Sequence, residues 1–194
     1  MARIGILGAG SWGTALAILL HDNGHDVTVW STHEKEVEML NTTRRHESKL
    51  PGVEIPEGIL FTTDMKETMS DKDVCVLAVP SPFIRSTCQK MKSYVRAGQI
   101  IVNVAKGIEE STLYTLTDII EEEMPYADAC VLSGPSHAEE VSRRLPTTCV
   151  VSARTRKTAE YLQSVFVSPV FRVYISPDML GIELGGALKN VIAL

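Results

Sequence analysis

One lysine stands among glycines and other small residues near the end of the 194-residue chain. Lys189 follows Gly185 and Gly186 on a segment whose apolar spacing predicts a helix from Asp178 onward. Each glycine inside a helix costs up to ~1 kcal/mol relative to alanine, so these glycines indicate close packing or the approach of a ligand. A lysine there could give and take a proton if burial and a nearby cation lowered its pKa from ~10.4.

A glycine motif near the start of the chain has the spacing of a nucleotide-binding loop. Gly8, Gly10 and Gly13 form GxGxxG between an apolar strand and a helix, which is the context typical of dinucleotide binding. Gly8 permits a tight turn, Gly10 leaves room for a pyrophosphate, and Gly13 lets the helix pack closely. The amides of Gly10, Ser11 and Trp12 would point at the pyrophosphate. The alternative is a turn that only joins strand to helix.

The residues after the second predicted strand bear on which dinucleotide binds. An acidic side chain at this point binds the ribose hydroxyls, whereas a basic side chain accepts a 2′-phosphate. No acidic residue directly follows Trp30, and Glu34 fits the first turn of the next helix. His33 and Lys35 could contact a phosphate, so we expect NADP to be accepted.

Other strand ends carry further candidates, because ligands of open parallel sheets lie outside the carboxyl ends of the strands. Phe83 could stack near a cofactor or make an apolar contact at a helix start. Lys106 would place an ammonium at the ligand edge, although a lone loop lysine is usually solvated. Ser136 and Glu139 fit a helix capping box, and His137 between them is a possible catalytic base.

Short apolar runs alternate with amphipathic helical stretches along most of the chain. Predicted strands lie at 4–7, 26–30, 59–62, 74–79, 100–104, 129–132, 149–151 and 170–174, and predicted helices at 11–22, 33–41, 82–94, 112–123, 138–144 and 155–167. This alternation predicts an α/β fold with a doubly wound, largely parallel sheet of the Rossmann type. We expect residues 1–177 to form a dinucleotide-binding domain and 178–194 the first helix of a second, all-helical domain. Residues 42–58 predict a long surface loop.

The composition narrows the class of protein. A hydrophobic fraction of 44% and a charged fraction of 22% are ordinary for a globular protein, and a net charge of −5 gives no basic footprint for nucleic acid. No apolar run reaches the ~18 residues of a membrane span, and the N-terminus lacks a signal-peptide layout. The four cysteines show no metal-binding spacing, so we expect no metal site and reduced, buried thiols in the cytoplasm.

Taken in order, these motifs resemble the bacterial-type NAD(P)-dependent glycerol-3-phosphate dehydrogenases. The matching segments are 8–17, 50–51, 79–81, 105–107, 133–136, 171–174 and 185–193, so the resemblance spans the whole chain. It implies hydride transfer between NAD(P)H and C2 of dihydroxyacetone phosphate or sn-glycerol 3-phosphate. That reaction supplies glycerol 3-phosphate for phospholipid synthesis.

The resemblance also implies a role for individual residues. Lys189 matches a proton donor and acceptor, Asn190 lies beside it, and Lys106 matches a catalytic lysine that contacts both substrate and cofactor. Gly134 and Ser136 match substrate-binding positions, together with the two lysines. Positions that bind the cofactor are matched by Gly8, Gly10, Ser11, Trp12, Gly13, Thr32, His33, Phe83, Lys106 and Ala138.

The chain departs from the family pattern in two residues and in length. Lys49 stands where many relatives carry an aromatic residue, and Thr32 stands where arginine is frequent. Family members continue into a helical domain, so we expect this fragment to bind cofactor but to be catalytically incomplete. The intact protein is expected to be a homodimer.

Two alternative functions remain at this point. The chain could be a stand-alone dinucleotide-binding or sensing module without turnover. It could also belong to another dehydrogenase of similar build that acts on a different hydroxy compound. The sequences around Lys106 and Lys189 argue against this last possibility.

Overall fold

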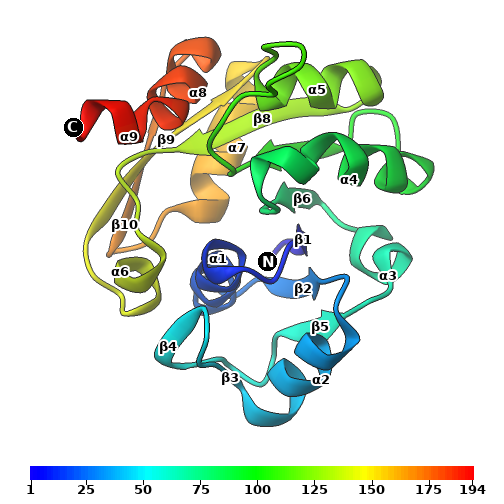
Figure 1. Cartoon of the computed structure of the whole chain (residues 1–194), viewed down its shortest axis with the longest axis vertical. Helices are drawn as coiled ribbons and strands as arrows, with labels where there is room; N and C mark the ends of the chain where they lie inside the picture. Colours follow the sequence, from blue (N-terminus) through cyan, green and yellow to red (C-terminus); the bar gives the residue numbers. More distant parts are fainter.

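A single eight-stranded sheet forms the centre of the molecule (Figure 1). The structure, a computed structural model, describes residues 1–194 except for the side chain of Ile192. The strands are β1 (Arg3–Leu7), β2 (Asp26–Trp30), β5 (Leu60–Thr62), β6 (Val74–Leu77), β7 (Ile100–Asn103), β8 (Asp128–Ser133), β9 (Thr147–Ala153) and β10 (Phe171–Ile175). Their order is β10-β9-β8-β7-β6-β1-β2-β5, and every neighbouring pair is parallel except β8 and β9. The predicted doubly wound, largely parallel sheet is confirmed.

Helices cover both faces of the sheet, which is why its central strands are buried on both sides. One face packs against α1 (Ser11–Asp22), α6 (Ala138–Ser142) and α7 (Arg156–Phe166). The opposite face packs against α3 (Met65–Met69), α4 (Ile84–Met91) and α5 (Leu116–Glu123). The 3-10 turns η1 (Ser81–Phe83) and η2 (Lys92–Tyr94) flank α4, and α2 (Glu34–Thr43) packs beside β5. No helix in the described part of the chain is long and apolar enough to cross a membrane.

The segment predicted as a long loop contains a small hairpin, so that prediction was wrong in part. Strands β3 (Arg45–His46) and β4 (Leu50–Glu54) pair antiparallel beside α1 and α2. Leu50 and Val53 are buried against the main core and anchor the hairpin. Its strands are too short and too interrupted by Pro51 and Gly52 to give an alternating apolar pattern.

The C-terminal segment consists of two helices rather than the one that the sequence predicts. α8 (Met179–Ala187) and α9 (Lys189–Ile192) are separated at Leu188, whose φ of −85° and ψ of 2° interrupt the helical path. The glycines that precede the break weaken the helix there. α8 lies over β8 and β9, and α9 follows it near the C-terminus (Figure 1). Lys189 is the first residue of α9.

Candidate functional site

The glycine loop lies where the strand order of the sheet reverses. β1 lies between β2 and β6: the chain runs from β1 through β2 to β5 and then crosses back to β6 on the other side of β1. Open α/β sheets bind ligands at such a point. Gly8 has a φ of +123°, and a Cβ there would lie 2.8 Å from the carbonyl oxygen of Ala78. A Cβ on Gly13 would overlap the carbonyl oxygen of Gly8. Gly10 has no atom within 4 Å of its Cβ position, so it faces open space.

The start of α1 suits an anionic group. Gly10 is the N-cap residue, no side chain caps the helix, and no acidic residue lies in its first turn. The first amides of a helix need acceptors, and the dipole favours a negative charge there. Ser11 and Trp12 contribute two of these amides, while the Trp12 ring packs against the core. This loop fits the pyrophosphate of a dinucleotide, and α6 packs beside α1, which brings Ala138 toward the same region.

A polar cluster that the sequence did not reveal lies beyond the end of β2. Thr32 and His33 are exposed there. Glu36 accepts hydrogen bonds from the Ser31 hydroxyl at 2.6 Å and from His46 Nε2 at 3.2 Å, and it pairs with the Lys49 ammonium.

Within this cluster the Glu36 carboxylate stays ionised, and the Lys49 ammonium balances its charge. Burial opposes its ionisation, but the bonds from Lys49 and Ser31 outweigh burial and hold its pKa below the ordinary value. Burial, followed by the Lys49 charge, lowers the pKa of His46. The hairpin supplies both His46 and Lys49, which explains why the sequence around β2 gave no sign of the cluster.

A second part of the site is a cavity of about 330 Å³ between the end of β8 and α8. The structure brings Lys106, Gly134 and Lys189 together in the lining of this cavity. The cavity is lined by Lys106, Ser133, Gly134, Pro135, Val150, Gly181, Ile182, Gly185, Gly186 and Lys189. Lys106 follows β7, and its ammonium donates a hydrogen bond of 2.9 Å to the Gly134 carbonyl oxygen.

The two lysines of the cavity differ in their surroundings. Burial lowers the pKa of Lys106, and the charge of Lys189 lowers it further. Lys189 itself is exposed at the start of α9, so the described residues do not provide the burial that the sequence analysis considered for it. Leu188, the C-cap residue of α8, directly precedes the lysine.

The glycines beside Lys189 have different functions in the structure. A Cβ on Gly186 would lie 2.8 Å from Ser133 Oγ and 3.5 Å from Lys106 Cγ, so Gly186 permits close packing of α8. Gly185 has no atom within 4 Å of its Cβ position and lines the cavity. Both interpretations that the sequence offered for these glycines, close packing and room for a ligand, therefore apply, each to one residue.

The loop after β8 differs from the expected capping box. His137, not Ser136, is the N-cap residue of α6, and no side chain caps this helix. Ser136 instead donates its amide to the Gly134 carbonyl oxygen at 2.8 Å, with its hydroxyl 3.4 Å from the same atom. The prediction failed because Ser136 belongs to the turn that holds Gly134. His137 is exposed.

Two further sequence candidates lie at the edges of the site. Phe83 ends η1 with 58% of its surface exposed. Asn190 is exposed on α9, next to Lys189.

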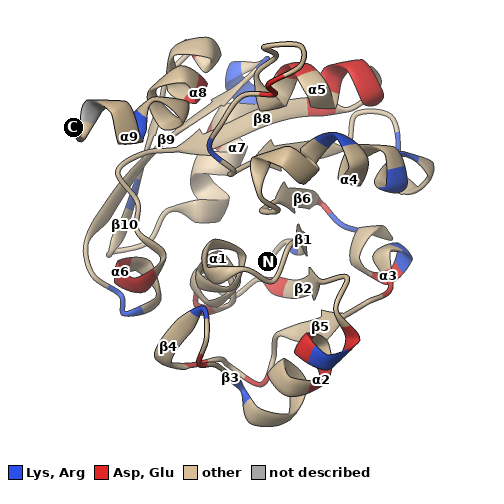
Figure 2. Ribbon diagram, in the orientation of Figure 1, with Lys and Arg blue, Asp and Glu red and all other residues tan. Residues whose placement is uncertain are grey.

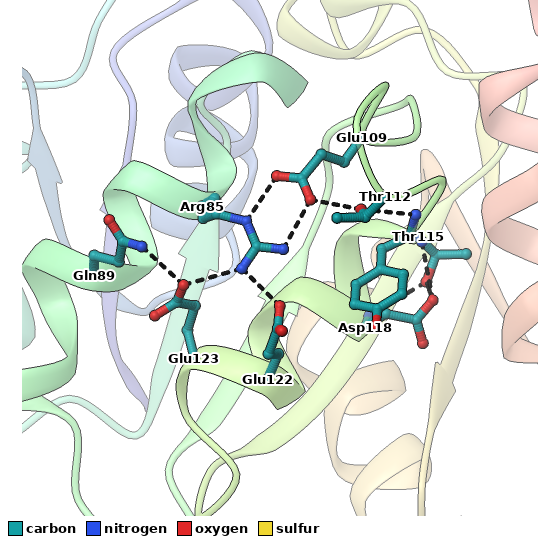
Figure 3. A network of polar contacts seen from close by, with 9 residues as sticks. Arg85, Gln89, Glu109, Thr112, Thr115, Asp118, Glu122 and Glu123 are labelled. Carbon is teal, nitrogen blue, oxygen red and sulfur yellow. Dashed lines mark hydrogen bonds and ion pairs between the residues drawn. The ribbon is translucent and has the colours of Figure 1, made fainter.

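A charged network fixes the loop that follows Lys106 (Figure 3). Arg85 of α4 donates two hydrogen bonds to Glu109, of 2.8 and 2.7 Å, and contacts Glu122 at 2.6 Å and Glu123 at 3.0 Å. Bonds from Arg85 and then Thr112 lower the pKa of Glu109 to about 2. Figure 2 shows the acidic end of α5 beside basic residues of α4. No local motif marks this network, because its members come from α4, α5 and the loop.

A family profile and curated relatives point to the same family. The profile described as NAD-dependent glycerol-3-phosphate dehydrogenase N-terminus matches residues 3–159. The chain is 61% identical over 194 residues to a glycerol-3-phosphate dehydrogenase (NAD(P)+) of Agathobacter rectalis. It is 56% identical over 196 aligned positions to the enzyme of the same description from Fusobacterium nucleatum. Both alignments cover 100% of this chain and 58% of the relative, so the chain spans little more than half their length.

A solved structure shows the same architecture. The crystal structure of glycerol-3-phosphate dehydrogenase from Coxiella burnetii superposes with a TM-score of 0.93 at 32% sequence identity. The match covers 99% of this chain and 59% of that chain.

Proposed function

The chain belongs to the NAD-dependent glycerol-3-phosphate dehydrogenase N-terminal family, and from this premise we propose that it is the cofactor-binding part of such an enzyme. The reaction is the interconversion of dihydroxyacetone phosphate and sn-glycerol 3-phosphate with NAD(P)H, which supplies a precursor of phospholipids. The observation that carries the proposal is the meeting of Lys106, Gly134 and Lys189 in one cavity. The family match argues against a dehydrogenase for an unrelated hydroxy compound.

The dinucleotide is held mainly by the glycine loop. Gly10 gives the pyrophosphate room, and the amides at the start of α1 bind its charge. When bound, the nicotinamide supplies or accepts the hydride at C2 of the substrate. At the end of β2, Lys49 neutralises Glu36 and so lessens the repulsion of a 2′-phosphate. Both NAD and NADP are therefore accepted, with Thr32, His33, Phe83 and Ala138 at the rim of the cofactor site.

The two lysines transfer the proton of the C2 oxygen and stabilise its negative charge. In the direction of reduction, Lys189 Nζ gives a proton to that oxygen, and Asn190 orients the group beside it. Lys106, held by the Gly134 carbonyl, keeps its ammonium aimed into the cavity and stabilises negative charge on the same oxygen. Gly134 and the turn of Ser136 bind the substrate at the end of β8.

The intact protein provides a second domain over this cavity. We assign residues 1–177 to the dinucleotide-binding domain and 178–194 to the start of a helical substrate domain. Exposed apolar residues on α8 and α9 support this division: Leu180, Leu184, Leu188 and Val191. The greater length of the relatives supports it too. The intact protein works as a homodimer in the cytoplasm, where the four buried free cysteines of this chain stay reduced.

The test compares Lys189→Ala with wild type in the intact protein, using dihydroxyacetone phosphate with NADH and with NADPH. We expect Lys189→Ala to lower turnover by roughly 10²–10⁴-fold, because it removes an acid–base group. We expect dinucleotide binding, measured by fluorescence, to be retained. Lys157→Ala, which removes an exposed lysine of α7, is the matched control and keeps full activity.

Two results would contradict the proposal. If Lys189→Ala retained turnover within tenfold of wild type, the lysine would not be the proton donor. If the intact wild-type protein bound NADH but reduced no substrate, the chain would belong to a binding or sensing module.

A further inference from the structure

A buried carboxylate lies between the segments that carry the two lysines of the cavity. Glu183 of α8 is only 5% exposed, and glutamate is almost never buried unless its oxygens have partners. Its Oε1 accepts the Thr117 backbone N–H at 3.0 Å and lies 3.5 Å from Asn103 Nδ2. Its Oε2 accepts the Thr117 hydroxyl. Burial raises the pKa of Glu183, although these bonds oppose the rise.

The partners of Glu183 lie at the two ends of the loop that carries Lys106. Asn103, the last residue of β7, accepts the Ala105 N–H at 3.1 Å and donates to the Ala105 carbonyl at 3.2 Å. Asn103 thereby fixes the backbone immediately before Lys106. Thr117 is the second residue of α5, which begins where the same loop ends. One carboxylate of α8 therefore contacts both ends of the loop.

Glu183 is also close to Lys189 along the chain. Lys189 is the sixth residue after Glu183 and directly follows Leu188, the C-cap residue of α8. Gly186, between them, packs its backbone against Ser133 and the Lys106 side chain. The far end of α8 is held by Asp178, which accepts the Gly181 N–H at 2.8 Å. Because α9 contacts α8 and starts directly after its C-cap residue, a shift of α8 at Glu183 also moves the start of α9, where Lys189 lies.

We propose that Glu183, Asn103 and Thr117 form a latch that fixes α8 on the Lys106 loop and sets the spacing of the Lys106 and Lys189 ammonium groups. Glu183 is a positioning residue, since it contacts the loop ends and does not line the cavity. The importance of this spacing for turnover rests on the proposed function, in which both cations act on one substrate oxygen. The latch itself is a property of the chain.

The first test measures the Lys106 pKa in the chain itself, by NMR of 13C-methylated lysines assigned with Lys106→Arg. In Glu183→Ala, α8 moves off the loop, so Lys106 gains water and loses the neighbouring charge of Lys189. Its pKa rises toward the ordinary value, because those two effects lower it in wild type. Glu183→Gln keeps the shape and two hydrogen-bonding atoms and retains most of the lowering. Thr117→Val removes one donor and gives a smaller rise in the same direction.

The second test measures amide exchange along α8, with α1 as the internal reference. In Glu183→Ala the buried Thr117 N–H and hydroxyl lose their acceptor, and we expect amide exchange in α8 to become about tenfold faster or more. Val165→Ala, which truncates a buried side chain of α7, is the matched control for general destabilisation. It leaves the Lys106 pKa unchanged. The latch is wrong if Glu183→Ala leaves both readouts at wild-type values, or if Val165→Ala changes the Lys106 pKa equally. If Glu183→Ala does not fold, Thr117→Val with both readouts decides.

Steady-state kinetics of the intact protein separate the latch from the proposed function. Glu183→Ala lowers kcat about tenfold or more with an unchanged dinucleotide Kd, and Glu183→Gln restores most of it. A shifted Lys106 pKa with no turnover in the wild-type protein would support the latch and overturn the proposed function. Normal wild-type turnover with no shift in Glu183→Ala would overturn the latch alone.

Discussion

Two glycines of the same loop are expected to respond in opposite ways to alanine. A Cβ on Gly13 would overlap the Gly8 carbonyl oxygen and lie 3.1 Å from its carbonyl carbon, and both atoms belong to rigid backbone. A Cβ on Gly10 would meet nothing within 4 Å, and its φ of −71° suits any residue. Gly13→Ala therefore strains the fold, whereas Gly10→Ala only fills the space proposed for the pyrophosphate.

The expected magnitudes follow from these contacts. Overpacking costs typically ~1–3 kcal/mol, and a clash with backbone places Gly13→Ala at about 3 kcal/mol. Gly10→Ala gains ~0.4–1 kcal/mol by restricting the unfolded chain and loses roughly 0.5–1 kcal/mol because glycine is preferred over alanine at an N-cap, so its net change is close to zero. With a urea m-value of about 2 kcal/mol per molar, the Gly13→Ala midpoint falls by about 1.5 M.

The assay is urea unfolding followed by circular dichroism, together with NADH binding followed by fluorescence. Gly10→Ala keeps the wild-type midpoint and loses at least about tenfold in NADH affinity, since a methyl group occupies the place of the phosphate. The reasoning fails if Gly10→Ala is as unstable as Gly13→Ala. It also fails if Gly10→Ala binds NADH as tightly as wild type.

Two further predictions concern the charged clusters. Lys49→Ala leaves Glu36 without its cation, so the affinity for NADPH falls roughly threefold relative to that for NADH, which is the size of effect expected from an exposed ion pair. Parallel titrations with the two dinucleotides measure this, and equal losses for both would refute it. Arg85→Ala raises the pKa of Glu109 from about 2 toward the ordinary 4.5. An NMR titration measures this shift, and an unchanged pKa of Glu109 would refute the prediction. Because the folded-state pKa is the lower one, the wild-type pair stabilises the protein above pH 4.5 and loses this effect as the pH falls toward 2.

Local patterns in the sequence predicted the elements that depend on local physics. The helix at 11–22 and the strand at 26–30 coincide with α1 and β2, since long periodic segments carry a strong signal. The helix predicted at 112–123 begins only at Leu116, because Thr115 and Asp118 form a capping box that starts it there. α3 was missed because its five residues are too few to show a period.

The sequence by itself determined the glycine loop, since strand, turn glycines and helix are neighbours in the chain and their geometry is set locally. The sequence also contains the two lysines, but it does not determine that they lie close together. β9 runs antiparallel to β8, and β10 follows it, so α8 returns over the sheet and brings Lys189 beside Lys106. The burial of Glu183 and the neutralisation of Glu36 likewise depend on partners from distant segments. Only tertiary structure decides such contacts, because burial and charge depend on what the whole chain places around a group.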